Sequence, residues 1–358
     1  MAVLVIDQGG QSTRALVYHP DGSSGPLQRC PSPTGHHDDD RIEHDSETLL
    51  ESVFSVVDDA QRSGNEPITA VGLATQRSSL LFWDAATGDA LTPVVSWQDR
   101  RAAEELEALA LDPVDVHART GLRPTAHYGA SKLRWFLDRE PSWRPAAKRG
   151  EIHAGPLASW LALRLTESAG SGLADPANAQ RTLLWNLRSC DWDPELLRRF
   201  DIPRALLPRC APTTGPFGNV AAVGAPLALV TGDQSAVVFG DGDPNPNRIA
   251  VTLGTGAFLQ RVTERPSDDA ALLTSVVRVD SDRASYVREA VINGCASALE
   301  RMISPNLRPP EHAPELERAL STVVDPPLFL NGVGGLGTPE WIADFESRWI
   351  GDGDGAER

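Results

Sequence analysis

The stretch VLVIDQGGQSTRALVYHPDG, residues 3–22, decides the fold, because two short apolar runs flank an acid and two glycines. Residues 3–6 and 15–18 are rich in β-branched or aromatic side chains and are bounded by turn residues, so they predict two strands. The Pro-Asp-Gly sequence that follows is typical of a turn. On this stretch alone, an ordinary hairpin with Asp and Gly in its loop is the alternative interpretation.

The turn between the two predicted strands carries groups suited to a phosphate and a metal ion. Gly9 and Gly10 have no side chain, so their backbone N–H groups can approach an oxyanion closely. Asp7 stands where the first strand is predicted to end, and a carboxylate there can hold Mg²⁺ directly or through water. The pattern therefore predicts a turn that binds a metal–phosphate group.

Length and composition describe a globular protein with two domains. At 358 residues the chain is too long for one small core. Charged residues make up 23% and hydrophobic residues 41%, which excludes a disordered chain. The net charge of −16 argues against a nucleic acid or an anionic membrane as partner, since both require a basic face.

Targeting and cysteine patterns favour a cytoplasmic protein. No apolar segment reaches about 18 residues, so no membrane span is expected. The N-terminus enters a predicted strand at once, without the basic and apolar regions of a signal peptide. The cysteines are far apart and lack C-x-x-C spacing, which indicates neither a zinc site nor a disulfide framework. They are Cys30, Cys190, Cys210 and Cys295.

Strand and helix patterns alternate along the chain, which predicts an α/β fold. The predicted strands are residues 68–74, 80–83 and 226–231. One helix is predicted to begin at residue 45 or 46, and further helices are predicted over 101–111, 131–137 and 157–165. Large side chains in and near these segments, Trp135, Trp160 and Trp185, are expected to pack in the core.

A polar stretch after the first strands has the residue types of a metal site. It contains His36, His37, Asp38, Asp39 and Asp40 in a row. Its composition is more typical of a solvated loop, and that is the expectation here.

The opening design recurs late in the chain. Residues 241–247 have the composition of a linker, and residues 249–262 then run as strand, Gly-Thr-Gly turn and returning strand. Two such turns, far apart in sequence, are what two related halves facing one nucleotide would present.

Six motifs, in order, give the chain a family resemblance. They are IDQGGQSTRALVY, VGLATQRSSLLFWDAATGDALTPVVSWQDRR, RRFDIPRALLP, TGDQSAVVFG, VTLGTGAFL and LFLNGVGGLGTPEW. The chain resembles the FGGY family of carbohydrate kinases, and the glycerol kinases within it most closely. The resemblance implies an α/β fold of two ribonuclease-H-like (actin-like ATPase) domains around a central cleft, residues 1–241 for sugar and phosphate and 248–358 for the nucleotide.

The resemblance also implies ATP and Mg²⁺ as cofactors and a role for each motif. Phosphoryl transfer to a hydroxyl needs a base, a metal and donors for the phosphate oxygens. Asp233 resembles the catalytic base and Asp7 the Mg²⁺ partner. The residues implied to bind nucleotide are Gln8, Gly9, Gly10 and Gln11 in a first phosphate loop, Gly254, Thr255 and Gly256 in a second, and Gly294 beside the adenine.

A second set of residues matches the family's acceptor pocket: Arg77, Ser78, Trp97, His127, Tyr128, Gln234 and Phe258. Ser78 stands where glycerol kinases carry an acid, and giving up a charge-assisted hydrogen bond costs roughly 1.5–3 kcal/mol. That is about ten- to a hundredfold in affinity. His127 and Tyr128 also change the family's aromatic pair. We therefore expect another polyol or sugar rather than glycerol.

Two further departures concern the nucleotide. Gly10 and Gln11 stand where glycerol kinases carry threonines, which removes hydroxyl donors from the first loop. The chain stops soon after GLGTPEW, so the second domain is expected to be incomplete and to lack the segment that holds adenosine. Besides a kinase, whose expected self-association is a homodimer, two alternatives remain. One is a non-catalytic homologue that binds a sugar or a partner chain. The other is a hydrolytic ATPase, which leaves Arg77, Trp97 and Gln234 unexplained.

Overall fold

The computed structural model describes residues 2–37, 40–64, 66–254, 256–280, 283–302, 318, 321, 327–342 and 344–351. The chain divides into two compact units, each considered by itself. The first unit comprises Met1–Pro244, Thr263–Ala270 and Thr274–Val287, and the second unit comprises Asn245–Val262, Ala271–Leu273 and Arg288–Arg358.

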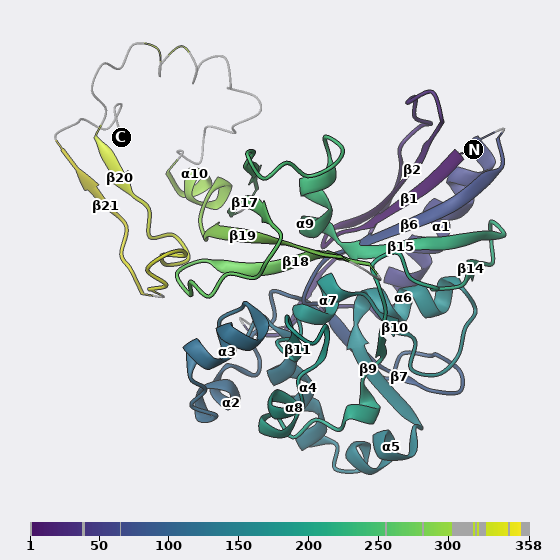
Figure 1. Cartoon of the computed structure of the whole chain (residues 1–358), viewed down its shortest axis with the longest axis horizontal. Helices are drawn as coiled ribbons and strands as arrows, with labels where there is room; N and C mark the ends of the chain where they lie inside the picture. The colour runs from purple at the N-terminus through teal and green to yellow at the C-terminus, as the bar shows by residue number, and fades with distance from the viewer. Residues whose placement is uncertain are drawn as a thin grey trace. The chain divides into compact units, whose positions relative to one another are not determined.

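A six-stranded sheet, in the order β14-β15-β6-β1-β2-β3, organises the first unit (Figure 1). Its central strands β15, β6 and β1 are parallel, and β2 runs antiparallel to β1 from Val3↔Tyr18 to Gln8↔Thr13. The two strands predicted from the opening stretch are therefore confirmed. The six strands are β1 (Ala2–Gln8), β2 (Ser12–Tyr18), β3 (Gln28–Pro31), β6 (Ile68–Thr75), β14 (Asn219–Val220) and β15 (Ala225–Gly232).

Helix α1 (Ser46–Ser63) packs on β1, β2 and β3 and forms much of the core. It begins where the sequence predicts, because the Asp45 side chain accepts a hydrogen bond from the Thr48 backbone N–H (2.8 Å) and caps the first turn. Apolar residues recur every three or four positions and give the helix one buried face. They are Leu49, Leu50, Val53, Val56, Val57 and Ala60.

A second sheet of the first unit has the order β4-β5-β8-β7-β9. Helix α6 (Leu157–Leu165), predicted at these bounds, packs on β6 and β15, and its Trp160 is fully buried and donates to the Gly88 carbonyl (2.9 Å). Trp185 is also fully buried, as expected. The sheet is built from β4 (Gly35–His36), β5 (Ile42–His44), β7 (Leu80–Asp84), β8 (Val94–Val95) and β9 (Ile152–Pro156).

Short elements complete the first unit. The helices are α2 (Ala103–Ala108), α3 (Pro113–Thr120), α4 (Gly129–Arg139), α5 (Trp143–Arg149), α7 (Pro176–Gln180), α8 (Pro194–Arg199) and α9 (Asp233–Ala236), with 3₁₀ turns at Arg204–Leu206 and Val237–Phe239. Two-residue strands pair as β10 (Leu173–Ala174) with β13 (Arg209–Cys210) and as β11 (Trp185–Asn186) with β12 (Asp191–Trp192).

Two expectations for this unit were wrong in detail. The helix predicted over 101–111 is the shorter α2, because Ala110 has a left-handed φ of 44° and Asp112, before Pro113, is extended and caps α3. Trp135 is half-buried rather than in the core, because the guanidinium groups of Arg139 and Arg101 lie 3.9 and 5.2 Å from its ring centroid.

The second unit contains the repeated hairpin predicted from residues 249–262. Strand β16 (Ala250–Leu253) pairs antiparallel with β17 (Ala257–Thr263), and Leu253 lies opposite Ala257. The later elements are α10 (Ala296–Met302), β20 (Leu328–Leu330) and β21 (Arg348–Ile350), and β18 (Leu273–Val279) and β19 (Ala284–Ile292) cross the division between the units. No helix in the described part of the chain is long and apolar enough to cross a membrane.

Gly121, which ends α3, gives a test of packing in the first unit. It has a φ of 73°, and a Cβ there would collide with the Thr274 carbonyl and lie 2.8 Å from Leu187 Cδ1. Gly150 ends α5 with a φ of 74° and has nothing within 4 Å. We expect Gly150→Ala to lower the free energy of unfolding by about 1–2 kcal/mol, because alanine is strained at a left-handed φ. Gly121→Ala should lower it by about 1–3 kcal/mol more, because its Cβ also clashes with neighbouring atoms. Urea unfolding of both variants measures the difference, and equal costs would contradict the packing.

Candidate functional site

The ends of three parallel strands bring the predicted catalytic side chains together. The register places Gln8 of β1 beside Thr75 of β6, and Thr75 beside Gly232 of β15. Because parallel strands in register end at one edge of a sheet, the residues that follow them are neighbours. Arg77 and Asp233 therefore meet at the same edge as the first glycine loop.

Asp233 begins α9 and faces a cation. Its Oδ1 lies 3.9 Å from Arg77 Nε and accepts a hydrogen bond from the Gln234 backbone N–H (2.6 Å). The side chain is 33% exposed, so a ligand can reach it. Burial raises the pKa of Asp233 above the ordinary range, Arg77 opposes this rise, and the nearby Asp7 charge adds to it. A carboxylate with a raised pKa is a stronger base than an ordinary Asp.

Arg77 crosses the backbone of Gly232, and only glycine leaves it room. A Cβ at Gly232 would lie 2.5 Å from Arg77 Cγ and 2.7 Å from its Cδ. The Arg77 side chain is only 8% exposed, so it has little freedom to move away. The next residue, Ser78, is half-buried with a left-handed φ of 66°. The glycine thus fixes the direction in which the guanidinium approaches Asp233.

Asp7 is more open than Asp233. Its side chain is 41% exposed and lies 3.7 Å from Arg14 Nη1, and burial raises its pKa against the opposing Arg14 charge. One or two carboxylates completed by water and phosphate oxygens are the donor set that Mg²⁺ takes, so the accessible Asp7 carboxylate fits that ion. Among the described residues no three His, Cys, Asp or Glu side chains form a metal cluster.

The polar stretch around His37 makes contacts within the protein that are typical of a loop. His37 Nε2 lies 3.2 Å from Glu43 Oε2, and the Asp40 carbonyl accepts from the Arg100 backbone N–H (2.8 Å). Asp38 and Asp39 lie outside the described residues. The contacts of His37 and Asp40 fit an ordinary loop.

Two glutamine side chains hold the first glycine loop: Gln8, which was predicted as a site residue, and Gln76, which was not. Gln8 is fully buried and donates to the Gly9 carbonyl (2.8 Å), while Gln76 donates to Gln8 Oε1 (3.2 Å). Gly9 N–H donates to the Ser12 carbonyl (3.1 Å), and the Gln11 carbonyl accepts from Ser32 N–H (3.0 Å). Gln76 follows a predicted strand end directly, so its position was the available signal.

The loop continues into the predicted acceptor pocket. A Cβ at Gly10 would lie 3.8 Å from Trp97 Nε1. Ser79 Oγ accepts from the Trp97 backbone N–H (3.0 Å) and donates to Gln76 Oε1 (2.9 Å). Trp97 is 40% exposed, as a ring that receives a ligand must be. The glycine loop and the pocket are therefore joined by one hydrogen-bonded chain.

His127 and Tyr128 take different positions. His127 is exposed, its Nδ1 lies 3.1 Å from the Trp97 carbonyl oxygen, and its ring centroid is 6.3 Å from that of Trp97. Tyr128 is buried, with the guanidinium carbon of Arg181 6.0 Å from its ring centroid. Of the two, His127 is the side chain that the structure offers to a ligand.

A fully buried lysine lies beneath the two loops that carry Trp97 and His127, whose rings we call the wall of the predicted acceptor pocket. Lys132 Nζ donates to the carbonyl oxygens of Ser96 (2.8 Å) and His127 (3.0 Å). Burial lowers the pKa of Lys132 to about 7, with Asp99 opposing the shift and Arg101 adding to it. No sequence motif marks Lys132, although it is one of two lysines in an arginine-rich chain.

The depressed pKa of Lys132 predicts how stability depends on pH. Between about pH 7 and 10 the unfolded chain keeps the lysine proton that the folded chain has lost, so the free energy of unfolding rises with pH. We expect the free energy of unfolding of the wild type, minus that of Lys132→Met, not to change with pH below about pH 7. Above it, the difference rises by up to about 1.4 kcal/mol per pH unit. Urea unfolding between pH 6 and 9 measures this difference, and a flat difference throughout would refute it.

The second unit supplies the other predicted nucleotide residues. Gly254 N–H donates to the Gly256 carbonyl (2.9 Å), and a Cβ at Gly256 would lie 2.8 Å from the Ile292 carbonyl. The Gly294 carbonyl accepts from Asn331 Nδ2 (2.5 Å), and Phe258 is half-buried on β17. A Cβ at Gly294 would lie 2.7 Å from the Val333 carbonyl, so close backbone packing requires glycine at both 256 and 294. Thr255 lies outside the described residues.

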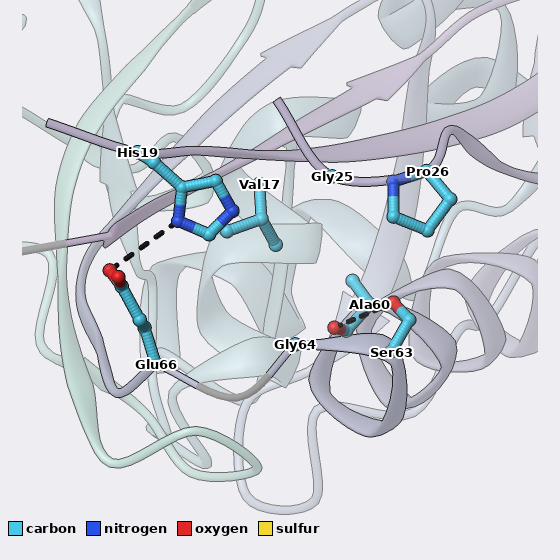
Figure 2. Close-up of a pocket in the computed structure, with 8 residues that line it drawn as sticks. All are labelled: Val17, His19, Gly25, Pro26, Ala60, Ser63, Gly64 and Glu66. Atoms are coloured by element: carbon cyan, nitrogen blue, oxygen red, sulfur yellow. Dashed lines mark hydrogen bonds and ion pairs between the residues drawn. The ribbon is translucent and has the colours of Figure 1, made fainter. Parts of the chain in front are cut away.

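A cavity of about 290 Å³ lies at the other end of β2 (Figure 2). The His19 ring faces Glu66 across it, with 3.4 Å between Nδ1 and Oε2. Since Tyr18 pairs with Val3 whereas Thr13 pairs with Gln8, this cavity and the glycine loop lie at opposite ends of the strand. Its lining residues are Val17, His19, Gly25, Pro26, Ala60, Ser63, Gly64 and Glu66.

Comparison with known proteins gives consistent matches. The model for the FGGY family of carbohydrate kinases, N-terminal domain, matches residues 2–244. A glycerol kinase of Alkalilimnicola ehrlichii is 35% identical over 370 residues, covering 100% of this chain and 74% of that protein. Glycerol kinase 1 of Pseudomonas aeruginosa is 36% identical over 360 residues, covering 95% of this chain and 71% of that protein.

Solved structures match the fold over nearly the whole chain. Plasmodium falciparum glycerol kinase with ADP superposes with a TM-score of 0.87 at 22% identity, covering 99% of this chain and 74% of that one. A xylulose kinase from Rhodospirillum rubrum superposes with a TM-score of 0.86 at 19% identity, covering 100% of this chain and 75% of that one. The mixed α/β fold of these kinases is therefore shared over about three quarters of their length.

Proposed function

The chain belongs to the FGGY family of carbohydrate kinases, and from this premise we propose that it transfers the γ-phosphoryl group of ATP to a hydroxyl of a small sugar or polyol. The observation that carries the proposal is the meeting of Asp233, Arg77 and the Asp7 loop at the ends of three parallel strands. Relatives named glycerol kinase and a solved glycerol kinase with ADP support it.

Asp233 is the proposed base. The acceptor hydroxyl loses its proton to the Asp233 carboxylate as its oxygen bonds to the γ-phosphorus, and the bond to the ADP oxygen breaks. Arg77, 3.9 Å from Asp233, orients the acceptor and keeps the carboxylate in one place. Its positive charge also opposes the rise that burial causes in the Asp233 pKa.

The nucleotide is proposed to bind through backbone donors and one carboxylate. In the first loop, Gly10 and Gln11 would face phosphate oxygens, while Gln8 and Gly9, whose own hydrogen bonds lie within the loop, would hold it in shape. Gly254, Thr255 and Gly256 of the second unit would also face phosphate oxygens, with Gly294 beside the adenine. Asp7 would hold Mg²⁺, which neutralises charge on the phosphates. We also propose that residues 1–241 and 248–358 form two ribonuclease-H-like domains. The proposed location is the cytoplasm, and the proposed oligomer is a homodimer.

The proposed acceptor site is suited to vicinal hydroxyls. The Oε1 atom of Gln234 is buried and has no hydrogen-bond partner among the described residues, so it is ready to accept from a hydroxyl. Trp97 offers an exposed aromatic face to a carbon skeleton. The remaining proposed contacts are Ser78, His127, Tyr128 and Phe258. Because Ser78 is not acidic, we propose a polyol or sugar other than glycerol.

Calorimetric titration with Mg-ATP and then with a panel of polyols and sugars tests the proposal, followed by ³¹P NMR of the mixtures. A sugar-phosphate resonance that appears only with both ligands supports the kinase. Sugar binding without phosphoryl transfer would instead indicate a non-catalytic homologue. Phosphate release that does not depend on any sugar would indicate a hydrolytic ATPase.

A further inference from the structure

The wall formed by Trp97 and His127 stands on two loops, and the side chain of Lys132 joins them. Lys132 is 0% exposed and its Nζ joins the Ser96 carbonyl (2.8 Å) to the His127 carbonyl (3.0 Å). These carbonyls belong to two loops that are 31 residues apart in sequence and that carry the proposed ligand-facing rings. An amine has at least two N–H groups whether neutral or protonated, so it serves both acceptors in either state.

The same wall determines which nitrogen of His127 carries hydrogen. Nδ1 lies 3.1 Å from the Trp97 carbonyl oxygen, which can only accept, so Nδ1 must be the donor. In the neutral ring, Nε2 then keeps a lone pair and is an acceptor. Desolvation by the surrounding protein atoms is the main cause that lowers the pKa of His127, and the bond to Trp97 opposes it. The nearby cations Lys132 and Arg100 lower the pKa further, so the shift favours the neutral ring.

We propose that Lys132 is a positioning residue that holds the 96–97 and 127–128 segments together and keeps His127 as an Nδ1–H tautomer, whose Nε2 accepts a hydrogen bond from a neutral hydroxyl of the acceptor. The proposal rests on the proposed function and deepens it. It names the ligand group that faces Nε2 as a hydroxyl of a polyol or sugar, since an ionised carboxylate has no proton to give to Nε2.

The first test needs neither substrate nor activity. The protein is labelled with ¹⁵N-histidine, and the ring signals of His127, one of eight histidines, are assigned with a His127→Gln variant. The wild type is expected to show the Nδ1–H pattern, and Lys132→Met to show a mixture of tautomers. Lys148→Met is the matched control, because Lys148 is the other lysine and is exposed on α5. An unchanged His127 pattern in Lys132→Met would overturn the proposal.

The second test separates positioning from general stability. With the sugar that the panel identifies, Lys132→Met is expected to raise KM about tenfold, the effect of one lost hydrogen bond, while kcat stays within about threefold. Lys148→Met should leave both unchanged. A lower melting temperature with unchanged KM would mean that Lys132 is merely structural, and the proposal would be abandoned. If no sugar is turned over, the proposed function fails while the histidine spectra still decide the role of Lys132.

Discussion

Asp233→Asn is expected to lower kcat by about 10²- to 10⁴-fold, because the amide has the size of the carboxylate but cannot take the proton of the acceptor hydroxyl. Binding of the sugar should change far less, since Arg77, Trp97 and Gln234 are untouched. The local structure should also be kept, because Asp233 Oδ1 accepts a hydrogen bond from the Gln234 backbone N–H (2.6 Å) and an amide oxygen can accept the same bond.

The measurement is steady-state kinetics together with calorimetric binding of the same sugar. Asp243→Asn is the control, since Asp243 is an exposed residue ten positions further along the chain. Both proteins should unfold at similar temperatures. Turnover of Asp233→Asn within about tenfold of wild type would exclude Asp233 as the base.

Gly232→Ala is expected to lower kcat/KM by about 10²-fold, through Arg77 rather than through the base itself. The new Cβ would lie 2.5 Å from Arg77 Cγ and 2.7 Å from its Cδ, both in the stem of the side chain rather than at its flexible end. The arginine must therefore shift, and a displacement of about 1 Å in an orienting group costs on the order of 10²-fold. The clash should also destabilise the fold by about 1–3 kcal/mol.

Gly72→Ala supplies the matched control for this variant. Gly72 lies on β6, paired with Leu229 of the strand that ends at Gly232, and a Cβ there meets nothing within 4 Å. It should keep near wild-type kcat/KM. If Gly232→Ala does the same, Arg77 does not orient the acceptor. A loss in both variants would instead indicate a general weakening of the sheet.

Local signals explain which elements could be predicted from the sequence. Helix α1 has a capping Asp45 and a regular apolar period, so it is predictable without tertiary information. The same holds for the strands β1, β6 and β15, which are short, largely apolar runs bounded by turn or polar residues. The helix predicted over 101–111 has strong local propensity, yet α2 ends at Ala108, because Ala110 is left-handed and Asp112 already caps α3. Propensity gave way there to the start of the next element.

The support of the site could not be predicted in the same way. Gln76 meets Gln8 across 68 positions, and Lys132 meets the Ser96 carbonyl across 36. Such contacts depend on strand register and on the packing of α4, which no local pattern specifies. The candidate residues stand in motifs that a family resemblance can identify, whereas the contacts that hold them in place form only when the chain folds.

The burial of Lys132 also makes the chain convenient for surface chemistry. Of its two lysines, Lys132 is fully enclosed and Lys148 is exposed on α5, so amine-directed reagents find a single lysine on the folded protein. A biotin or fluorophore ester should attach there and leave the wall around Trp97 untouched. The α-amino group reacts with the same reagents and, because of its lower pKa, can be blocked first near neutral pH. The protein immobilised through Lys148 could then be screened against sugars by surface plasmon resonance.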